Sequence, residues 1–475
     1  LKAEESIRDS GGMPQMFGTI TVSDGISMGT EGMKYSLVSR EVIADSIETA
    51  CNAQSMDGVL AIGGCDKNMP GAMIAIARMN IPSIFIYGGT IKPGKLNGED
   101  LTVVSAFEAV GQLASGKINE KRLIEVEKNC IPGAGSCGGM FTANTMSAVI
   151  EVLGLSLPHS STMAAEDYEK EVSAEKSAEI LVDAIKKGIK PLDLMTKKSF
   201  ENAIAVDMAI GGSTNAIVHL LAMAGRAGVE LSLSDFDEIS RKTPLITDLR
   251  PSGKFLMEDF YFAGGLPAVL KRMESILHMD LPTVNGKTLA ENVVNSQVHN
   301  NKVIRTIEDP IAPDGGTTVL GGNLAPNGAV IKHSAADPSL LKHSGPAIVF
   351  DNYKELSERI DDPDLPVTKD SVLVLKNAGP IGAPGMPEWG MLPIPKKLLK
   401  EGVRDMVRVS DARMSGTSYG TCVLHVAPES AAGGPLAAVQ DGDIITLDVE
   451  SRTINLELAE EEIEKRIEGL SKRKD

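Results

Sequence analysis

A short stretch near the start of the chain, residues 59–71, most constrains how this chain can fold. Its sequence is Val-Leu-Ala-Ile-Gly-Gly-Cys-Asp-Lys-Asn-Met-Pro-Gly. The four apolar residues predict a buried strand, the two glycines end it, and Pro70 suits the first turn of a following helix. Cys65, Asp66 and Lys67 are thus expected at the carboxyl end of a strand, where open α/β sheets bind their ligands. Taken alone, the peptide also fits an ordinary turn with a half-buried thiol, a capping carboxylate and a solvated amine.

The first third of the chain alternates strand and helix patterns. Apolar runs that end in glycine or polar residues predict strands, and an apolar period near 3.6 predicts helices. The predicted strands are 17–22, 59–62 and 81–87, with a helix over 38–54 between the first two. This βαβαβ order predicts an α/β fold with a parallel sheet whose polar loops gather at one edge. Helical periodicity then dominates residues 101–272.

The character of the chain changes after a polar connector at residues 283–303. Short apolar runs separated by glycine, proline and asparagine follow, which is typical of a barrel or a sandwich. These runs are 317–320, 329–332, 347–350, 372–375, 406–409, 422–426 and 444–449. A chain of 475 residues also exceeds the usual size of a single core. We therefore predict a parallel-sheet α/β domain over 1–298 and a β-rich, barrel-like domain over 299–475.

Charge and cysteine content exclude several classes of protein. A formal net charge of −17 without a basic run argues against a surface that binds nucleic acid. The sequence has no apolar stretch of about 18 residues, so it predicts no membrane span. Five cysteines are too few, and odd in number, for a disulfide scaffold, so we expect reduced thiols in the cytoplasm. A plastid or mitochondrial location stays open, because the chain begins at Leu1 without a Met.

Two cysteines are candidate ligands for a soft metal. Cys65 follows Gly64, and Cys137 lies in the glycine-rich stretch 132–139, Pro-Gly-Ala-Gly-Ser-Cys-Gly-Gly. Thiolates flanked by glycine suit an iron–sulfur cluster, whose sulfides accept hydrogen bonds from backbone N–H groups. The alternative is two ordinary buried cysteines, which is the commoner fate of a free thiol. The G-x-G-x-x-G pattern at 133–138 is not read as a nucleotide-binding loop, because no convincing strand precedes it.

Three acids are candidate ligands for a hard cation. Asp24 and Asp66 follow two neighbouring predicted strands, so their carboxylates can share one Mg²⁺. Glu388 lies in 377–390, where seven of fourteen residues are Gly or Pro, and so rigid a loop suggests a positioned carboxylate. Each acid can equally be a cap or a turn residue. Lys67 would repel a cation here unless it is a structural ion-pair partner or its amine is carbamylated by CO₂, and the sequence leaves both interpretations open.

A final polar loop, residues 409–418, follows a predicted strand and presents Ser415 before a glycine. A serine in this position can contact a phosphate or carboxylate, stabilise a turn, or act as a base once a metal favours its deprotonated form. No Ser–His–Asp arrangement is visible nearby, which argues against acyl transfer.

The sequence around these residues resembles the family of dihydroxy-acid and sugar-acid dehydratases, most of all its dihydroxy-acid branch. The resemblance covers essentially the whole chain, and its eight motifs follow the family's order. They are 17–29 (FGTITVSDGISMG), 36–41 (SLVSRE), 64–67 (GCDK), 135–140 (GSCGGM), 211–215 (GGSTN), 322–326 (GNLAP), 385–388 (GMPE) and 413–416 (RMSG).

The resemblance implies an enzyme, a lyase of branched-chain amino-acid and pantothenate biosynthesis. Its substrates would be small (2R)-2,3-dihydroxy acids, namely 2,3-dihydroxy-3-methylbutanoate and 2,3-dihydroxy-3-methylpentanoate, which it would dehydrate to 2-oxo acids. The alternative within the family is a sugar-acid dehydratase of the aldonate or phosphogluconate type. From other classes, the alternatives are a metal-dependent hydrolase and a non-catalytic ligand-binding protein. A large α/β enzyme of this kind is expected to be a homodimer.

The resemblance also assigns roles to individual residues. The family's magnesium carboxylates match Asp24, Asp66 and Glu388, and its carbamylated lysine matches Lys67. Two of the three cysteines that bind the iron–sulfur cluster, for which the 2Fe–2S type is favoured over 4Fe–4S, match Cys65 and Cys137. The proton acceptor matches Ser415. The first cluster cysteine is expected upstream of Leu1, since no cysteine of this chain takes its place.

The chemistry of dehydration agrees with these roles. The departing 3-hydroxyl needs an acid, and a cluster iron left open by three-cysteine ligation is a Lewis acid. The C2 proton needs a base, and Mg²⁺ bound to the substrate carboxylate and 2-hydroxyl would acidify it. Ser415 as an alkoxide would then remove the proton, with the site expected between the two domains.

Overall fold

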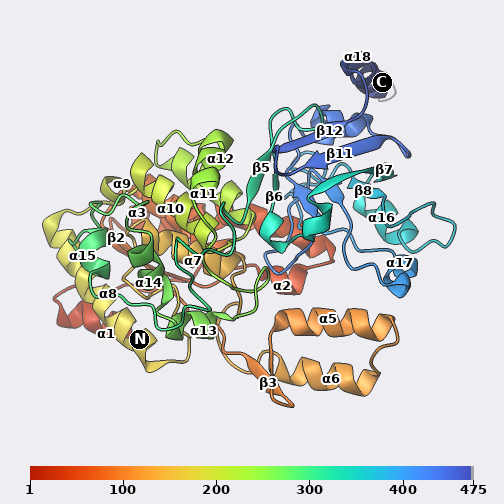
Figure 1. Cartoon of the computed structure of the whole chain (residues 1–475). Coiled ribbons are helices and arrows are strands. Elements are labelled where there is room, and N and C mark those ends of the chain that lie inside the picture. Colours follow the sequence, from red (N-terminus) through yellow and green to blue (C-terminus); the bar gives the residue numbers. More distant parts are fainter. Residues whose placement is uncertain (472–475) are drawn as a thin grey trace. The chain divides into compact units, whose positions relative to one another are not determined.

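The computed structural model of the chain describes residues 1–471, and residues 472–475, the end of the sequence, lie outside the described part. The chain forms two compact units, which are considered one at a time (Figure 1). Unit 1 comprises Leu1–Asp24 and Val38–Gly315, and unit 2 comprises Gly25–Leu37 and Gly316–Asp475. The predicted fold class is confirmed, with a parallel sheet in the N-terminal region and a barrel-like sheet in the C-terminal region.

The unit border near the middle of the chain differs from the predicted division into 1–298 and 299–475. Residues 299–315 lie in unit 1. There Ile304 forms an isolated antiparallel bridge with Thr247, and the Asp248 backbone N–H donates to the carbonyl of Val303. These contacts join segments that lie more than fifty residues apart in sequence. Such contacts cannot be predicted from a change in local composition.

An early segment, residues 25–37, belongs to unit 2 although it lies within the predicted N-terminal domain. The carbonyl oxygen of Lys34 approaches Gly385 so closely that a Cβ at Gly385 would lie 1.8 Å from it. The Lys34 ammonium also lies 5.7 Å from the centre of the Trp389 ring. Only glycine at position 385 permits this approach, so residues 25–37 can pack against the glycine-rich loop of unit 2 only because that loop lacks a side chain there.

The parallel sheet of unit 1 consists of β1 (Val59–Gly63) and β2 (Ser83–Tyr87), in register from Val59 opposite Ser83 to Gly63 opposite Tyr87. The helix α4 (Asn68–Met79) connects them and is buried over Met69–Ala77. These elements confirm the predicted strand–helix–strand unit. β2 is buried throughout, whereas Ile62 in β1 is 66% exposed, so the expectation that β1 is fully buried was wrong.

The predicted strand 17–22 was also wrong. These residues lie within the described part of the chain and form no strand there, so unit 1 has βαβ rather than βαβαβ order. Phe17 and Ile20 are 46% and 52% exposed, and the segment contacts the body of unit 1 through the Thr21 hydroxyl, which accepts from Asn68 at 3.0 Å. An apolar run without a partner strand has no ladder to join, and within the described residues β1 pairs with β2 alone.

Helices supply most of unit 1, as the periodicity predicted. Two of them, α7 and α10, are buried on nearly every side, which is typical of helices at the centre of a domain. The short strands β3 (Gly94–Leu96) and β4 (Glu99–Leu101) pair ahead of α5 and α6, which pack side by side (Figure 1). The helices of this unit, apart from α4, are α1 (Lys2–Asp9), α5 (Val103–Ala114), α6 (Glu120–Asn129), α7 (Thr142–Val152), α8 (Tyr168–Lys187), α9 (Pro191–Leu194), α10 (Lys197–Ala209), α11 (Asn215–Arg226), α12 (Leu233–Lys242), α13 (Met257–Phe262), α14 (Gly265–Arg272) and α15 (Leu289–Val293).

Unit 2 is built on one eight-stranded sheet in the order β12-β11-β7-β8-β9-β10-β6-β5. Its strands are β5 (Thr318–Leu320), β6 (Ala329–Ile331), β7 (Lys342–Phe350), β8 (Val372–Leu375), β9 (Arg408–Ser410), β10 (Cys422–Leu424), β11 (Ile444–Asp448) and β12 (Thr453–Leu456). Seven correspond to the predicted runs, and β12 was missed because four alternating residues give little signal. A bridge between Gly321, directly after β5, and Thr453 joins the two outer strands, so the sheet is nearly closed.

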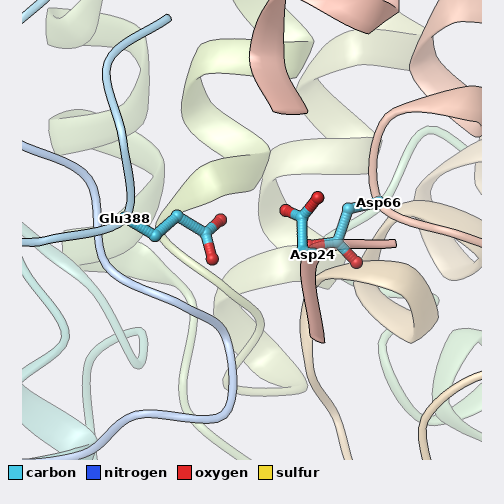
Figure 2. A group of neighbouring side chains, drawn as sticks. All are labelled: Asp24, Asp66 and Glu388. Atoms are coloured by element: carbon cyan, nitrogen blue, oxygen red, sulfur yellow. The ribbon is translucent and has the colours of Figure 1, made fainter. Parts of the chain in front are cut away.

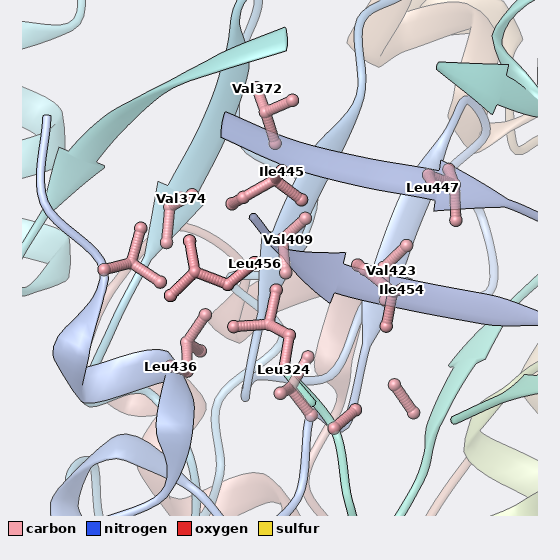
Figure 3. Close-up of a cluster of buried hydrophobic side chains, with 14 of the residues drawn as sticks. Leu324, Val372, Val374, Val409, Val423, Leu436, Ile445, Leu447, Ile454 and Leu456 are labelled. Carbon is pink, nitrogen blue, oxygen red and sulfur yellow. The ribbon is translucent and has the colours of Figure 1, made fainter. Parts of the chain in front are cut away.

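The central strands of unit 2 are buried on both faces. Ala347, Val349, Val372 and Val374 point into one apolar cluster, which Figure 3 shows, and the residues between them point into a second cluster. Burial on both faces explains why these strands read as unbroken apolar runs. Each fully buried Val or Leu contributes about 1.5–3 kcal/mol to the stability of this core.

The remaining helices of the chain are short or lie at unit borders. α16 (Tyr353–Arg359), α17 (Lys396–Glu401) and α18 (Glu460–Ser471) belong to unit 2, while α2 (Asp24–Ser27) and α3 (Lys34–Ala53) cross from one unit to the other in sequence. Across residues 1–471, no helix combines the length and the apolar character that a membrane span requires.

Candidate active site

The turn after β1 carries three consecutive functional side chains. The Asn68 side-chain oxygen accepts hydrogen bonds from the backbone N–H groups of Gly64 (3.2 Å) and Cys65 (3.0 Å) and so closes the turn before α4. Capping by the neighbouring carboxylate is therefore not needed, and Asp66 contacts Lys67 instead. The Asn68 amide thus stabilises the turn, and the Asp66 carboxylate is not needed for this purpose.

Asp24, Asp66 and Lys67 form a buried charged group in unit 1, and Figure 2 shows the two aspartate side chains next to one another. The Lys67 Nζ lies 2.5 Å from Asp24 Oδ2 and 3.5 Å from Asp66 Oδ2. Lys67 is fully buried, and Asp24 and Asp66 are 5% and 8% exposed. Two carboxylates against one ammonium leave a formal negative charge where little water can screen it. Such a pair of oxygen donors can hold a divalent cation once the ammonium charge is removed.

Cys65 adjoins this charged group. Burial, and after it the carboxylates of Asp66 and Asp24, raise the pKa of the Cys65 thiol to about 11. A thiol with this pKa stays protonated and unreactive at neutral pH, because the thiolate is the nucleophile. A metal that binds the Cys65 sulfur would displace the proton and stabilise the thiolate, since metal binding and thiol deprotonation are coupled.

The loop that carries Cys137 lies against the loop that carries Cys65. The Ser136 hydroxyl donates a hydrogen bond to the carbonyl of Gly64, the residue before Cys65. The Ser136 backbone N–H donates to the carbonyl of Gly89, just after β2, at 2.9 Å. The two cysteines therefore follow residues that are hydrogen-bonded to each other, at the carboxyl ends of β1 and β2, which is where the sequence predicted a ligand site.

In unit 2, Glu388 is held by a buried arginine. Arg413 Nη1 donates to Glu388 Oε1 at 2.8 Å, and its Nε donates to the carbonyl of Met386 at 2.9 Å. Both side chains of this ion pair are fully buried. Trp389 stacks on Tyr353, with ring centres 4.3 Å apart and planes 12° from parallel. The arginine orients the Glu388 carboxylate, as a residue behind a metal ligand does.

Ser415 lies in the loop between β9 and β10 and is 7% exposed. Its Oγ lies 2.9 Å from the hydroxyl of Thr417 and accepts a hydrogen bond from the Thr417 backbone N–H at 3.3 Å. A donor aimed at the oxygen of a serine favours the deprotonated form of that serine. The surroundings of Ser415 are thus compatible with a base as well as with a turn residue.

The described structure brings some of the predicted site residues together within one unit. Unit 1 holds the acid–lysine group and the two adjoining cysteine loops, that is Asp24, Asp66, Lys67, Cys65 and Cys137. Unit 2 holds the other two, Glu388 and Ser415. The binding of Mg²⁺ and of an iron–sulfur cluster by these residues, and the role of Ser415 as a base, stay predictions.

Sequence reasoning missed two buried polar residues that support these loops. Arg413 lies in a quoted motif, but no pattern in the sequence pointed to its contact with Glu388. Asn144 lies in α7, in which every residue is buried, and its side chain donates hydrogen bonds to the carbonyls of Cys137 and Gly139. No pattern in the sequence singles out this asparagine, because the same helix also contains Thr145, Ser147 and Glu151. Its role follows only from its burial, since buried amides almost always have specific partners.

Comparison with known proteins gives consistent matches along the chain. Residues 1–292 match the family model described as dihydroxy-acid/6-phosphogluconate dehydratase N-terminal, and residues 302–475 match its C-terminal counterpart. The dihydroxy-acid dehydratase of Prochlorococcus marinus strain MIT 9515 is 64% identical over 472 residues, covering 98% of this chain and 83% of that protein. The dihydroxy-acid dehydratase of strain SARG is 58% identical over 476 residues, with the same coverage.

Proposed function

The chain belongs to the dihydroxy-acid/6-phosphogluconate dehydratase family, and from this premise we propose that it is a dihydroxy-acid dehydratase. It removes water from 2,3-dihydroxy-3-methylbutanoate and 2,3-dihydroxy-3-methylpentanoate to give 2-oxo acids for valine, isoleucine and pantothenate biosynthesis. The identity of 64% to a dihydroxy-acid dehydratase, over 98% of this chain, carries the proposal. At this identity the sugar-acid alternative is not favoured.

We propose that Cys65 and Cys137 bind an iron–sulfur cluster of the 2Fe–2S type. The fit is supported by the hydrogen bond between Ser136 and Gly64, which keeps the two cysteine loops together. Both cysteines are partly exposed, unlike Cys51, Cys130 and Cys422, which are buried. Glycines beside each cysteine leave space for a bulky inorganic group and leave backbone N–H groups to face it.

We propose that Asp24, Asp66 and Glu388 bind Mg²⁺ together with a carbamylated Lys67. The fit is supported by the convergence of two buried carboxylates on Lys67 Nζ. An ammonium at this point would repel the cation. A carbamate would remove that positive charge and add oxygen donors, which Mg²⁺ prefers. Arg413 supports the role of Glu388, because it fixes one carboxylate oxygen and leaves the side chain buried and oriented.

In the proposed reaction, each group of residues has a separate role in the dehydration. When bound, the cluster supplies a Lewis acid for the 3-hydroxyl, and Mg²⁺ supplies positive charge for the carboxylate and 2-hydroxyl. Ser415 Oγ, supported by the Thr417 N–H, takes the proton from C2 of the substrate. The C3–O bond breaks, the proton that the Ser415 alkoxide accepted passes to the departing hydroxide, which leaves as water, and Ser415 returns to the alkoxide. The resulting enol becomes the 2-oxo acid.

The proposal is tested by purifying the protein without oxygen and measuring iron, sulfide and the 2-oxo acid formed. We expect turnover of 2,3-dihydroxy-3-methylbutanoate, with 6-phosphogluconate a poor substrate. Faster turnover of 6-phosphogluconate would move the protein to the sugar-acid branch. Turnover that survives complete removal of iron would contradict the role of the cluster in the reaction, and no turnover of either substrate would contradict the proposed activity.

We also propose a cytoplasmic homodimer. The five cysteines of the chain form no disulfide bond, which suits a reducing compartment. Enzymes of this size most commonly form twofold-symmetric dimers. Light scattering at micromolar concentration checks the mass, and a monomeric value would contradict the dimer.

A further inference from the structure

The buried amide of Asn144 holds the backbone that follows the Cys137 side chain. Asn144 is fully buried in the first turn of α7. Its Nδ2 donates to the carbonyls of Cys137 (2.6 Å) and Gly139 (2.7 Å), while the carbonyl of Gly138 accepts from the Met257 N–H at 2.9 Å. Three consecutive carbonyls are therefore held by three N–H bonds, so the peptides that follow the Cys137 thiol have a single conformation.

The oxygen of the Asn144 amide is held by a residue of β2. The Tyr87 hydroxyl, at the end of β2, donates to Asn144 Oδ1 at 2.6 Å, and Tyr87 is 1% exposed. The Tyr87 carbonyl in turn accepts from the buried ammonium of Lys170 at 3.0 Å. Both donors and the acceptor of the amide are thus used, and its orientation follows from the strand rather than from the loop itself.

We propose that Asn144 is a positioning residue that sets the direction of Cys137 toward the group it binds, with Tyr87 holding Asn144 in place. This inference rests on the proposed function for the identity of that group, the iron–sulfur cluster. Residues behind metal ligands orient them, and their loss typically weakens metal binding about 10- to 100-fold. Asn144 does not reach the reacting atoms, so its effect passes through the Cys137 backbone alone.

The test compares two isosteric changes in unit 1, Asn144→Asp and the control Asn202→Asp. Asn202 is also buried and also makes two hydrogen bonds, to the backbone N–H and carbonyl of His278. Each aspartate keeps the shape of the side chain and loses its N–H donors. The first readout is backbone hydrogen exchange of residues 132–141 in protein without iron, measured by mass spectrometry. The second is the half-life of the reconstituted cluster under a chelator, followed by visible circular dichroism.

We expect Asn144→Asp to speed exchange in 132–141 at least tenfold and to shorten the half-life of the cluster about 10- to 100-fold, with an altered dichroism spectrum. Asn202→Asp should leave both readouts at the parent values even if it lowers the melting temperature. Equal effects of the two variants would mean a general loss of structure and would overturn the proposal. Parent-like exchange and half-life in Asn144→Asp would also overturn it.

Two further measurements cover the cases in which Asn144→Asp does not fold or the parent protein binds no cluster. If Asn144→Asp does not fold, Tyr87→Phe removes only the hydroxyl that holds the amide, and exchange in 132–141 should rise several-fold. Parent-like behaviour of Tyr87→Phe would then overturn the proposal. If the parent protein binds no iron–sulfur cluster, the cluster assignment fails, whereas the exchange measurement still decides whether Asn144 holds the Cys137 loop.

Discussion

Replacing Lys67 by methionine removes the ammonium between Asp24 and Asp66 and keeps most of the apolar stem. In protein without metal, the two carboxylates, 5% and 8% exposed, then lack the cation that lies 2.5 Å from one and 3.5 Å from the other. Loss of one partner of a buried ion pair typically costs about 3–5 kcal/mol, because the remaining charge stays out of water. Lys67 is completely buried, so solvent screening reduces this cost little.

This cost can be converted into a shift of the melting temperature. Unit 1 has roughly 300 residues, and an unfolding entropy of about 2.1 cal/mol/K per residue gives it about 0.6 kcal/mol/K. A loss of 4 kcal/mol therefore lowers its melting temperature by about 6 °C. Calorimetry in EDTA measures the shift, with Lys197→Met as the control. Lys197 pairs with Asp235 at 2.5 Å, but its side chain is 41% exposed, so that change should cost at most about 1 kcal/mol.

The same variant tests the metal site and the carbamate. Saturating Mg²⁺ should restore part of the lost stability of Lys67→Met, because the cation replaces the ammonium between the carboxylates. The variant should bind Mg²⁺ more weakly than the parent, because the carbamate ligand is gone. In the parent protein, bicarbonate should strengthen the stabilisation by Mg²⁺, whereas Lys67→Met should not respond to bicarbonate. If Lys67→Met melts like the parent in EDTA, the ammonium does not balance the two aspartates and the reasoning fails. Full activity of Lys67→Ala would end the carbamate hypothesis.

Three other changes give separate tests. Ser415→Ala should keep iron and Mg²⁺ but lose exchange of the C2 proton with deuterium, followed by NMR of bound substrate; parent-like exchange would show that another group is the base. Burial raises the pKa of Glu151 to about 7 from its usual 4.5, so its contribution to stability is full below pH 4.5 and is lost as pH rises toward 7. The melting temperature of Glu151→Gln should fall less than that of the parent between pH 5 and 7.5, and parallel curves would contradict this. Gly135→Ala should shorten the half-life of the cluster, because φ is +133° there and a Cβ would lie 2.5 Å from the carbonyl oxygen of Thr90; a parent-like half-life would show that the loop adapts.

Local sequence was sufficient to predict most of the helices and strands and to name the candidate site residues. The strand–glycine–helix pattern at 59–71 predicted β1, the functional turn and α4, because each depends on neighbouring residues. The unbroken apolar runs of unit 2 predicted seven of its eight strands, since strands buried on both faces need no alternation. The motifs named the acids, the cysteines and the serine because functional residue types recur in a fixed local order.

Tertiary structure alone decided the features that depend on distant partners. Residues 17–22 have the composition of a strand, but no neighbouring strand pairs with them in the described structure. Lys34 joins unit 2 through its approach to Gly385, which lies about 350 positions further along the chain. The amide of Asn144 holds the Cys137 loop only because Tyr87, from another element, fixes its other end. Periodicity reports the faces that a segment buries, whereas a hydrogen-bond partner far away in sequence is selected only when the chain packs.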